Sequence, residues 1–197
     1  PKRFEDGTTE TLPIGDEAIN GFYLDENDAV NGNELQFTNQ KPYVIYGYAA
    51  VPSGKTVTFD AGARVHFHAN SGLIVANNAS IQVNGSASTT EKLENEVIFE
   101  GDRLEPDFAD VPGQWGTIWL TDGSTNNNLN HLTIKNATIG LLIQNNDGTT
   151  VNLKNTQIYN STNYGILAQT AKIKGENIVI NDAGLAGLAC SYGGDYS

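Results

Sequence analysis

Cysteine, basic residues and long apolar runs are scarce in this sequence, and each scarcity excludes a class of protein. A single cysteine, Cys190, excludes a disulfide within the chain; its Gly-Leu-Ala-Cys setting predicts a small buried core residue rather than a nucleophile or metal ligand. No apolar run approaches the roughly 18 residues that a membrane span requires. Only 11 lysines and arginines face 23 aspartates and glutamates, a formal net charge of −12, which argues against nucleic acid or an anionic membrane surface as a partner.

One sequence pattern occurs three times between Leu129 and Cys190. Each copy holds a short apolar strand, an asparagine or aspartate, and then a glycine that opens another strand. The strands centre on Ile134, Ile158 and Ile180, 24 and 22 residues apart, and the glycines are Gly140, Gly165 and Gly187, 25 and 22 apart. A repeat of this length, made of short alternating strands, is typical of the coils of a β-helix, in which equivalent positions stack and share one core.

The repeat predicts an all-β fold, a right-handed parallel β-helix of roughly five or more coils. The three isoleucines should point inward and Lys135, Tyr159 and Asn181 outward. Asn136, Asn160 and Asp182 should form the turns, where such side chains tolerate a left-handed backbone. The chain reaches Ser197 within a coil, without a capping helix, so we expect the helix to be truncated at its C-terminal end.

Two regions follow from the distribution of charge and strands. Residues 1–40 are acidic and poor in apolar residues, which predicts a lead-in that caps the first coil or a remnant of a preceding domain. Residues 41–197 carry the β-helix, with strands at Lys41–Tyr46, Thr56–Phe59, Arg64–Phe67, Gly72–Val75, Ser80–Val83, Val97–Phe99 and Thr117–Leu120. Residues 86–95 are expected to form a plain solvated loop. Residues 100–116, which we call the excursion loop, interrupt the coils and should project from one face.

Several short motifs resemble a known family. They are Lys41-Pro-Tyr-Val-Ile-Tyr-Gly47, Phe99-Glu-Gly-Asp-Arg-Leu-Glu-Pro106, Val111-Pro-Gly-Gln-Trp-Gly116 and Gly193-Gly-Asp195. The family is the right-handed parallel β-helix repeat lipoproteins of the Gram-negative cell envelope. The resemblance implies secretion, association with the outer membrane at the cell surface or in the periplasm, and an Ig-like domain before the helix. It also implies an acylated cysteine that lies outside this sequence, so contact with a membrane is expected only through that lipid anchor.

The excursion loop holds most of the candidate ligand-binding residues. Asp102, Glu105 and Asp110 could act as acid and base or hold Ca²⁺, and the guanidinium of Arg103 could organise an acidic loop. In the structural alternative, Arg103 pairs with Asp102 or Glu105, while Trp115 fixes the loop to the coil. The candidate ligand-binding residues are Asp102, Arg103, Glu105, Asp110, Trp115, Trp119 and Tyr159.

Aromatic and histidine side chains supply two further hypotheses. Trp115, Trp119 and Tyr159, with Tyr164, could form a platform on which a sugar ring stacks. His66 and His68 alternate in one strand and share a face, so they could bind a transition metal if a third ligand were near. No metal site and no cofactor are expected, with Ca²⁺ as the one exception considered.

Two functions from different classes remain. The first is a noncatalytic envelope or surface module that presents a rigid face and the excursion loop to a protein partner or a glycan. The second is a polysaccharide lyase or hydrolase of the β-helix type. Enzymes of this kind need carboxylates on an outward face, but the outward positions of the three clear repeats carry none. The sequence therefore predicts no catalytic residues and favours the first function.

Overall fold

The computed structural model describes residues 2–3, 9–10, 35–145 and 148–197. Most of the predicted lead-in, residues 1–40, lies outside the described residues. Within it, β1 (Lys2–Arg3) pairs antiparallel with β2 (Thr9–Glu10). Strand β3 (Gln36–Phe37) also belongs to that region, yet it pairs in parallel with β6, so the coils begin before the predicted boundary at residue 41.

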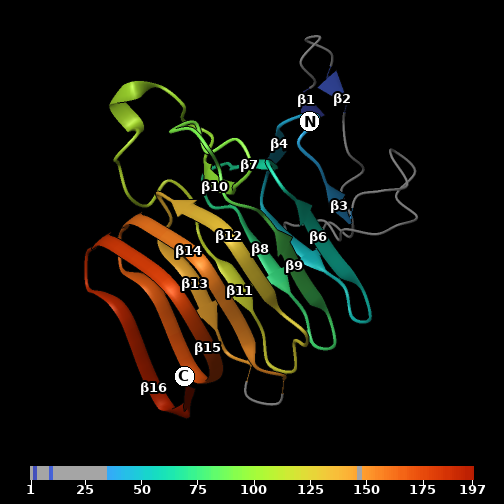
Figure 1. Cartoon of the computed structure of the whole chain (residues 1–197), viewed down its shortest axis with the longest axis vertical. Coiled ribbons are helices and arrows are strands. Elements are labelled where there is room, and N and C mark those ends of the chain that lie inside the picture. Colours follow the sequence, from blue (N-terminus) through green and yellow to red (C-terminus); the bar gives the residue numbers. More distant parts are fainter. Residues whose placement is uncertain (1, 4–8, 11–34, 146–147) are drawn as a thin grey trace.

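The main body is a parallel β-helix of about seven turns (Figure 1), as predicted. Its strands form three faces, and long strands turn the corner from one face to the next. Face A contains β4 (Tyr43–Ile45), β7 (Arg64–Phe67), β10 (Val97–Gly101), and the later parts of β12 (Asn128–Lys135) and β14 (Val151–Ser161). It ends on the last part of β15 (Tyr164–Ala183).

The other two faces complete each coil. Face B contains β5 (Tyr48–Val51), β8 (Gly72–Val75), β11 (Ile118–Leu120), β13 (Ile139–Ile143), and the first parts of β15 and β16 (Ala186–Tyr196). Face C contains β3, β6 (Thr56–Asp60), β9 (Ser80–Asn84), the first parts of β12 and β14, the middle of β15 and the end of β16. The small residues of Tyr48-Ala-Ala-Val51 gave no strand signal, and β5 was not predicted.

The core stacks in the predicted register. Ile134 pairs with Ile158 and Ile158 with Ile180, and Phe99 precedes them on the same ladder. Phe99, Ile134 and Ile158 are completely buried, and Ile180 is partly buried. Full burial of each such side chain contributes roughly 1.5–3 kcal/mol to the free energy of unfolding.

The corner after face A also follows the prediction. Asn136, Asn160 and Asp182 have φ of 64°, 55° and 54°. This left-handed conformation is strained for most side chains, and asparagine and aspartate tolerate it because their short polar groups hydrogen-bond nearby backbone. The asparagine or aspartate two residues after each isoleucine therefore sets where the chain turns.

One expectation about burial was wrong. Cys190 occupies an inward position, paired with the buried Ala168, yet it is exposed, and Leu188 beside it is 54 % exposed. Both lie on β16, which pairs with β15 on one side only among the described strands. Residues 86–95 form a loop without a buried residue, as predicted, and the loop is anchored at its end. Arg64 of face A donates to the carbonyl oxygens of Leu93 (2.7 Å) and Glu96 (2.6 Å), which holds the end of this segment against the coil.

Candidate functional site

Trp115 fixes the excursion loop to the core, as the structural alternative predicted. Its indole is 1 % exposed and stacks on Phe67, with centroids 4.1 Å apart and planes at 9°. The indole N–H donates to the carbonyl oxygen of Lys135 at 2.8 Å. The ring therefore has no face open to a ligand, and its inclusion among the sugar-stacking residues is wrong.

The tip of the loop is held by one amide from the coil and one from the loop itself. Asn136 donates through Nδ2 to the carbonyl oxygens of Ala109 (3.0 Å) and Val111 (2.9 Å). Gln114 donates to Val111 as well, and to Phe108 of the 3₁₀ turn Pro106–Phe108. Asn136 thus forms the corner of the coil with its backbone and holds the loop with its side chain.

Arg103 pairs with Glu105, so one of the two predicted partners is confirmed. Its Nε lies 3.2 Å from both carboxylate oxygens, and its guanidinium carbon lies 3.8 Å from the ring centre of Phe108. The hydrogen bonds from Arg103 lower the pKa of the exposed Glu105. Asp102 takes a different partner, because its Oδ2 lies 2.7 Å from Nδ1 of His68.

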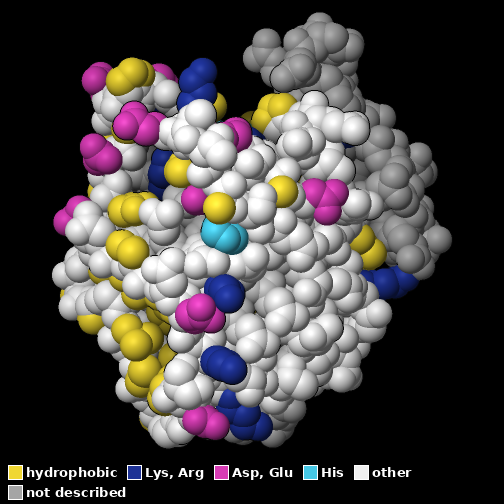
Figure 2. Space-filling model, viewed as in Figure 1, with side chains coloured by type: hydrophobic (Ala, Val, Ile, Leu, Met, Phe, Trp, Pro, Cys, Tyr) yellow, Lys and Arg dark blue, Asp and Glu magenta, His cyan; other side chains and the backbone are white. Residues whose placement is uncertain are grey.

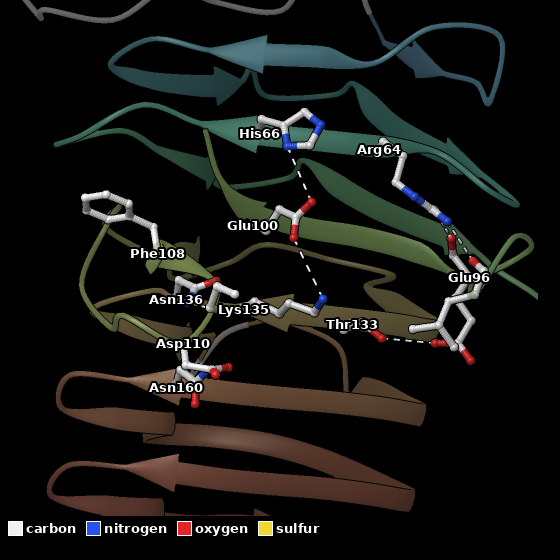
Figure 3. Close-up of polar contacts among 12 residues, drawn as sticks. Arg64, His66, Glu96, Glu100, Phe108, Asp110, Thr133, Lys135, Asn136 and Asn160 are labelled. Atoms are coloured by element: carbon white, nitrogen blue, oxygen red, sulfur yellow. Dashed lines mark hydrogen bonds and ion pairs between the residues drawn. The ribbon is translucent and has the colours of Figure 1, made fainter. Parts of the chain in front are cut away.

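A ladder of titratable side chains runs down the outward side of face A. His66, Glu100 and Lys135 occupy adjacent strands, and Figure 3 shows Glu100 between the other two. Glu100 lies 3.6 Å from His66 Nδ1 and 3.8 Å from Lys135 Nζ. Burial lowers the pKa of His66, although Glu100 and Asp102 act in the opposite direction. The repeats predicted that Lys135 points outward. They did not indicate its neighbours in this ladder, because Glu100 comes from a coil outside the clear repeats.

Below this ladder, the excursion loop and face A enclose a groove of about 670 Å³. Its walls are Ala109, Asp110 and Pro112 of the loop, and Lys135, Tyr159, Asn160, Asn181 and Asp182 of the coils. Lys135, Tyr159 and Asn181 are the three predicted outward positions, aligned by the register of β12, β14 and β15. Asn160 donates to Asp110 Oδ1 at 3.3 Å, which ties the loop to the corner. Acidic side chains gather over the loop in Figure 2.

The structure brings two of the seven candidate residues into the groove, Asp110 and Tyr159. Asp102, Arg103 and Glu105 are engaged with the partners described above. Trp119 lies half-buried on face B, in register with Ile74 and Leu142, and donates to Gln144. It does not line the groove with Tyr159. Asn160, Asn181 and Asp182 were missed as site residues, because the excursion loop that completes the groove comes from a distant part of the sequence.

His66 and His68 do share one face. His66 lies beside Glu100 of β10, and His68 lies beside Asp102, the residue after β10. Within the ranges that the structure describes, however, no three His, Cys, Asp or Glu side chains converge as a metal site. The same part of the chain contains no helix long and apolar enough to span a membrane.

The groove and the coils define a β-solenoid with a loop-walled cleft on one face. No family model, curated protein or solved structure matches the chain.

Proposed function

We propose that this chain is a noncatalytic module of a bacterial cell envelope whose groove receives a sugar chain. The observation that carries the proposal is the composition of the groove. One aromatic ring, two amides and two carboxylates line a single concave space whose volume lies within the usual range for ligand pockets.

Each of these groups suits a carbohydrate. Aromatic rings present an apolar face and, in tyrosine, a polar edge, and sugar rings have both kinds of surface. The amides of Asn160 and Asn181 donate and accept hydrogen bonds, and the carboxylates of Asp110 and Asp182 accept them from hydroxyl groups. A protein partner is the other ligand considered, but the concave shape favours a chain over a flat protein surface.

The position of the groove also favours a binding role. The coil residues stand on stacked strands, and Asn136, Asn160 and Trp115 hold the loop against them. Side chains on rigid elements lose little entropy when a ligand binds. The envelope location and the lipid anchor rest on the sequence resemblance alone, and fractionation of membranes from the source cell tests both.

A polysaccharide lyase or hydrolase is the second candidate. One observation favours it: Asp110 and Asp182 line the same groove, and paired carboxylates perform acid–base chemistry in glycosidases. Release of reducing ends or unsaturated products from a bound polysaccharide, abolished in Asp110→Asn, would establish this reaction and overturn the noncatalytic proposal.

The binding proposal is tested with a glycan array, followed by calorimetric titration of the best ligand. Tyr159→Ala should weaken binding about tenfold, because the aromatic face is lost. Tyr192→Ala is the matched control, because Tyr192 is 82 % exposed and lies outside the groove. Equal affinities for the two variants, or no glycan bound by the intact chain, would contradict the proposal.

A further inference from the structure

The charge of the groove points to a narrower ligand class. We propose that the groove selects sugar chains bearing free amino groups, such as hexosamine polymers, over uncharged and uronic-acid chains. This inference rests on the proposed function, since it assigns the chemistry of the ligand in the same groove.

Among the described residues, the two carboxylates of the groove have neutral hydrogen-bond partners. Asp110 accepts a hydrogen bond from Asn160, and Asp182 accepts one from Asn181. Both partners are neutral amides, and neither carboxylate forms an ion pair with any described residue. Both side chains are exposed at the walls of the groove, so their charge is available to a ligand.

The cation among the lining residues is already paired. Lys135 Nζ lies 3.8 Å from Glu100 Oε2, and Glu100 lies in turn beside the buried His66. Burial lowers the pKa of His66 and so favours its neutral form at pH 7. Glu100 therefore offsets the charge of Lys135, and the field of Asp110 and Asp182 is left uncompensated.

The negative charge of the groove should favour binding of some classes of polysaccharide over others. A uronic-acid chain would bring its carboxylates beside Asp110 and Asp182, in a protein that already carries a net charge of −12. The carboxylates of the ligand and of the protein would repel each other, and this repulsion grows as the salt concentration is lowered. A protonated amine would instead find two carboxylates, and Tyr159 of the same groove would hold the sugar ring.

Calorimetric titrations with three oligosaccharides test the inference: a fully deacetylated glucosamine hexamer, its N-acetylated form, and an oligogalacturonate. At pH 6 and low salt the deacetylated hexamer should bind tightest, and 300 mM NaCl should reduce its advantage. In Asp110→Asn/Asp182→Asn its affinity should fall about tenfold, with binding of the acetylated form kept. Asparagine is compatible with the left-handed backbone at residue 182.

Two controls separate the failure of this inference from the failure of the proposed function. Asp107→Asn removes a carboxylate of the same loop that does not line the groove, and should leave the preference intact. Tyr159→Ala should weaken both hexosamine ligands. If Tyr159→Ala abolishes binding but the acetylated or uronate chains bind as tightly as the amine, the glycan groove stands and its charge selectivity falls. If oligolysine binds and no sugar does, both are overturned.

Discussion

The indole of Trp115 and the phenyl ring of Phe67 lie face to face, 4.1 Å apart between centroids. This contact joins the end of the excursion loop to the core of the neighbouring coil. Replacement of Trp115 by alanine should lower the free energy of unfolding by about 3–5 kcal/mol, the usual loss for a buried aromatic side chain.

Urea denaturation checks this value. Trp115→Phe should retain part of the stacking and lose less, and Trp119→Ala, at a half-buried site on face B, serves as the control. A Trp115→Ala variant that unfolds at the wild-type urea concentration would contradict the packing. Since Trp115 carries stability, its loss is not a clean test of ligand binding.

The stacked glycines of face B should differ in their tolerance of alanine. A Cβ at Gly165 would lie 2.3 Å from Ile180 Cγ2 and 2.7 Å from the Gly187 carbonyl oxygen, whereas a Cβ at Gly187 would meet Ile180 at an ordinary 3.5 Å. Gly165→Ala should therefore lower the melting temperature through an overpacking cost of about 1–3 kcal/mol. Gly187→Ala should change it little. Equal melting temperatures for the two variants would show that the coil spacing is wrong.

Stability should depend on the protonation of His66. Burial holds its pKa below the ordinary 6.5, despite the opposing effect of Glu100 and Asp102. The unfolded state therefore binds a proton at a higher pH than the folded state, and the free energy of unfolding should fall as pH decreases from 7 through that interval. His66→Gln should flatten the decrease, measured by urea unfolding at several pH values. His131→Asn removes a different histidine, and a flattening of equal size there would refute the assignment to His66.

The excursion loop should loosen when its amide support is removed. Asn136→Gly keeps the left-handed corner but deletes the two hydrogen bonds to Ala109 and Val111. We expect faster protease cleavage within the loop and a loss of about 1–3 kcal/mol in stability. Asn160→Gly, which removes one side-chain bond to the loop, should show a smaller effect. Unchanged cleavage rates in both variants would mean that the amides do not restrain the loop.

Most of the fold could be predicted from the three repeats, because equivalent residues of successive coils stack on one another. Ile134, Ile158 and Ile180 could be aligned because identical residues at nearly equal spacing, 24 and 22 residues, occupy one ladder. The left-handed corners could be predicted as well, because an asparagine or aspartate recurs two residues after each isoleucine. Strand β5 could not be predicted, because apolar and polar residues alternate too little in Tyr48-Ala-Ala-Val51 to indicate a strand.

Single residues of the groove could be predicted from the sequence, but their proximity could not. Tyr159 and Asp110 were both candidates, but they are 49 residues apart and nothing in their local sequence places them in one groove. Their proximity depends on where the excursion loop folds back, which Trp115, Asn136 and Asn160 decide together. The sequence left two roles open for Trp115, since a tryptophan between Gln114 and Gly116 suits a ligand platform as well as an anchor.

The excursion loop leaves and rejoins the coil at one corner. A Cβ at Gly101 would lie 2.3 Å from Gln114 Oε1, so the two ends of the loop touch, while Gln114 and Trp115 already pair with the next coil. The segment between these ends can therefore be exchanged without shifting the register of the strands. A library of grafted segments at residues 103–112 would turn the solenoid into a scaffold for new specificities, much as hypervariable loops do on an antibody framework.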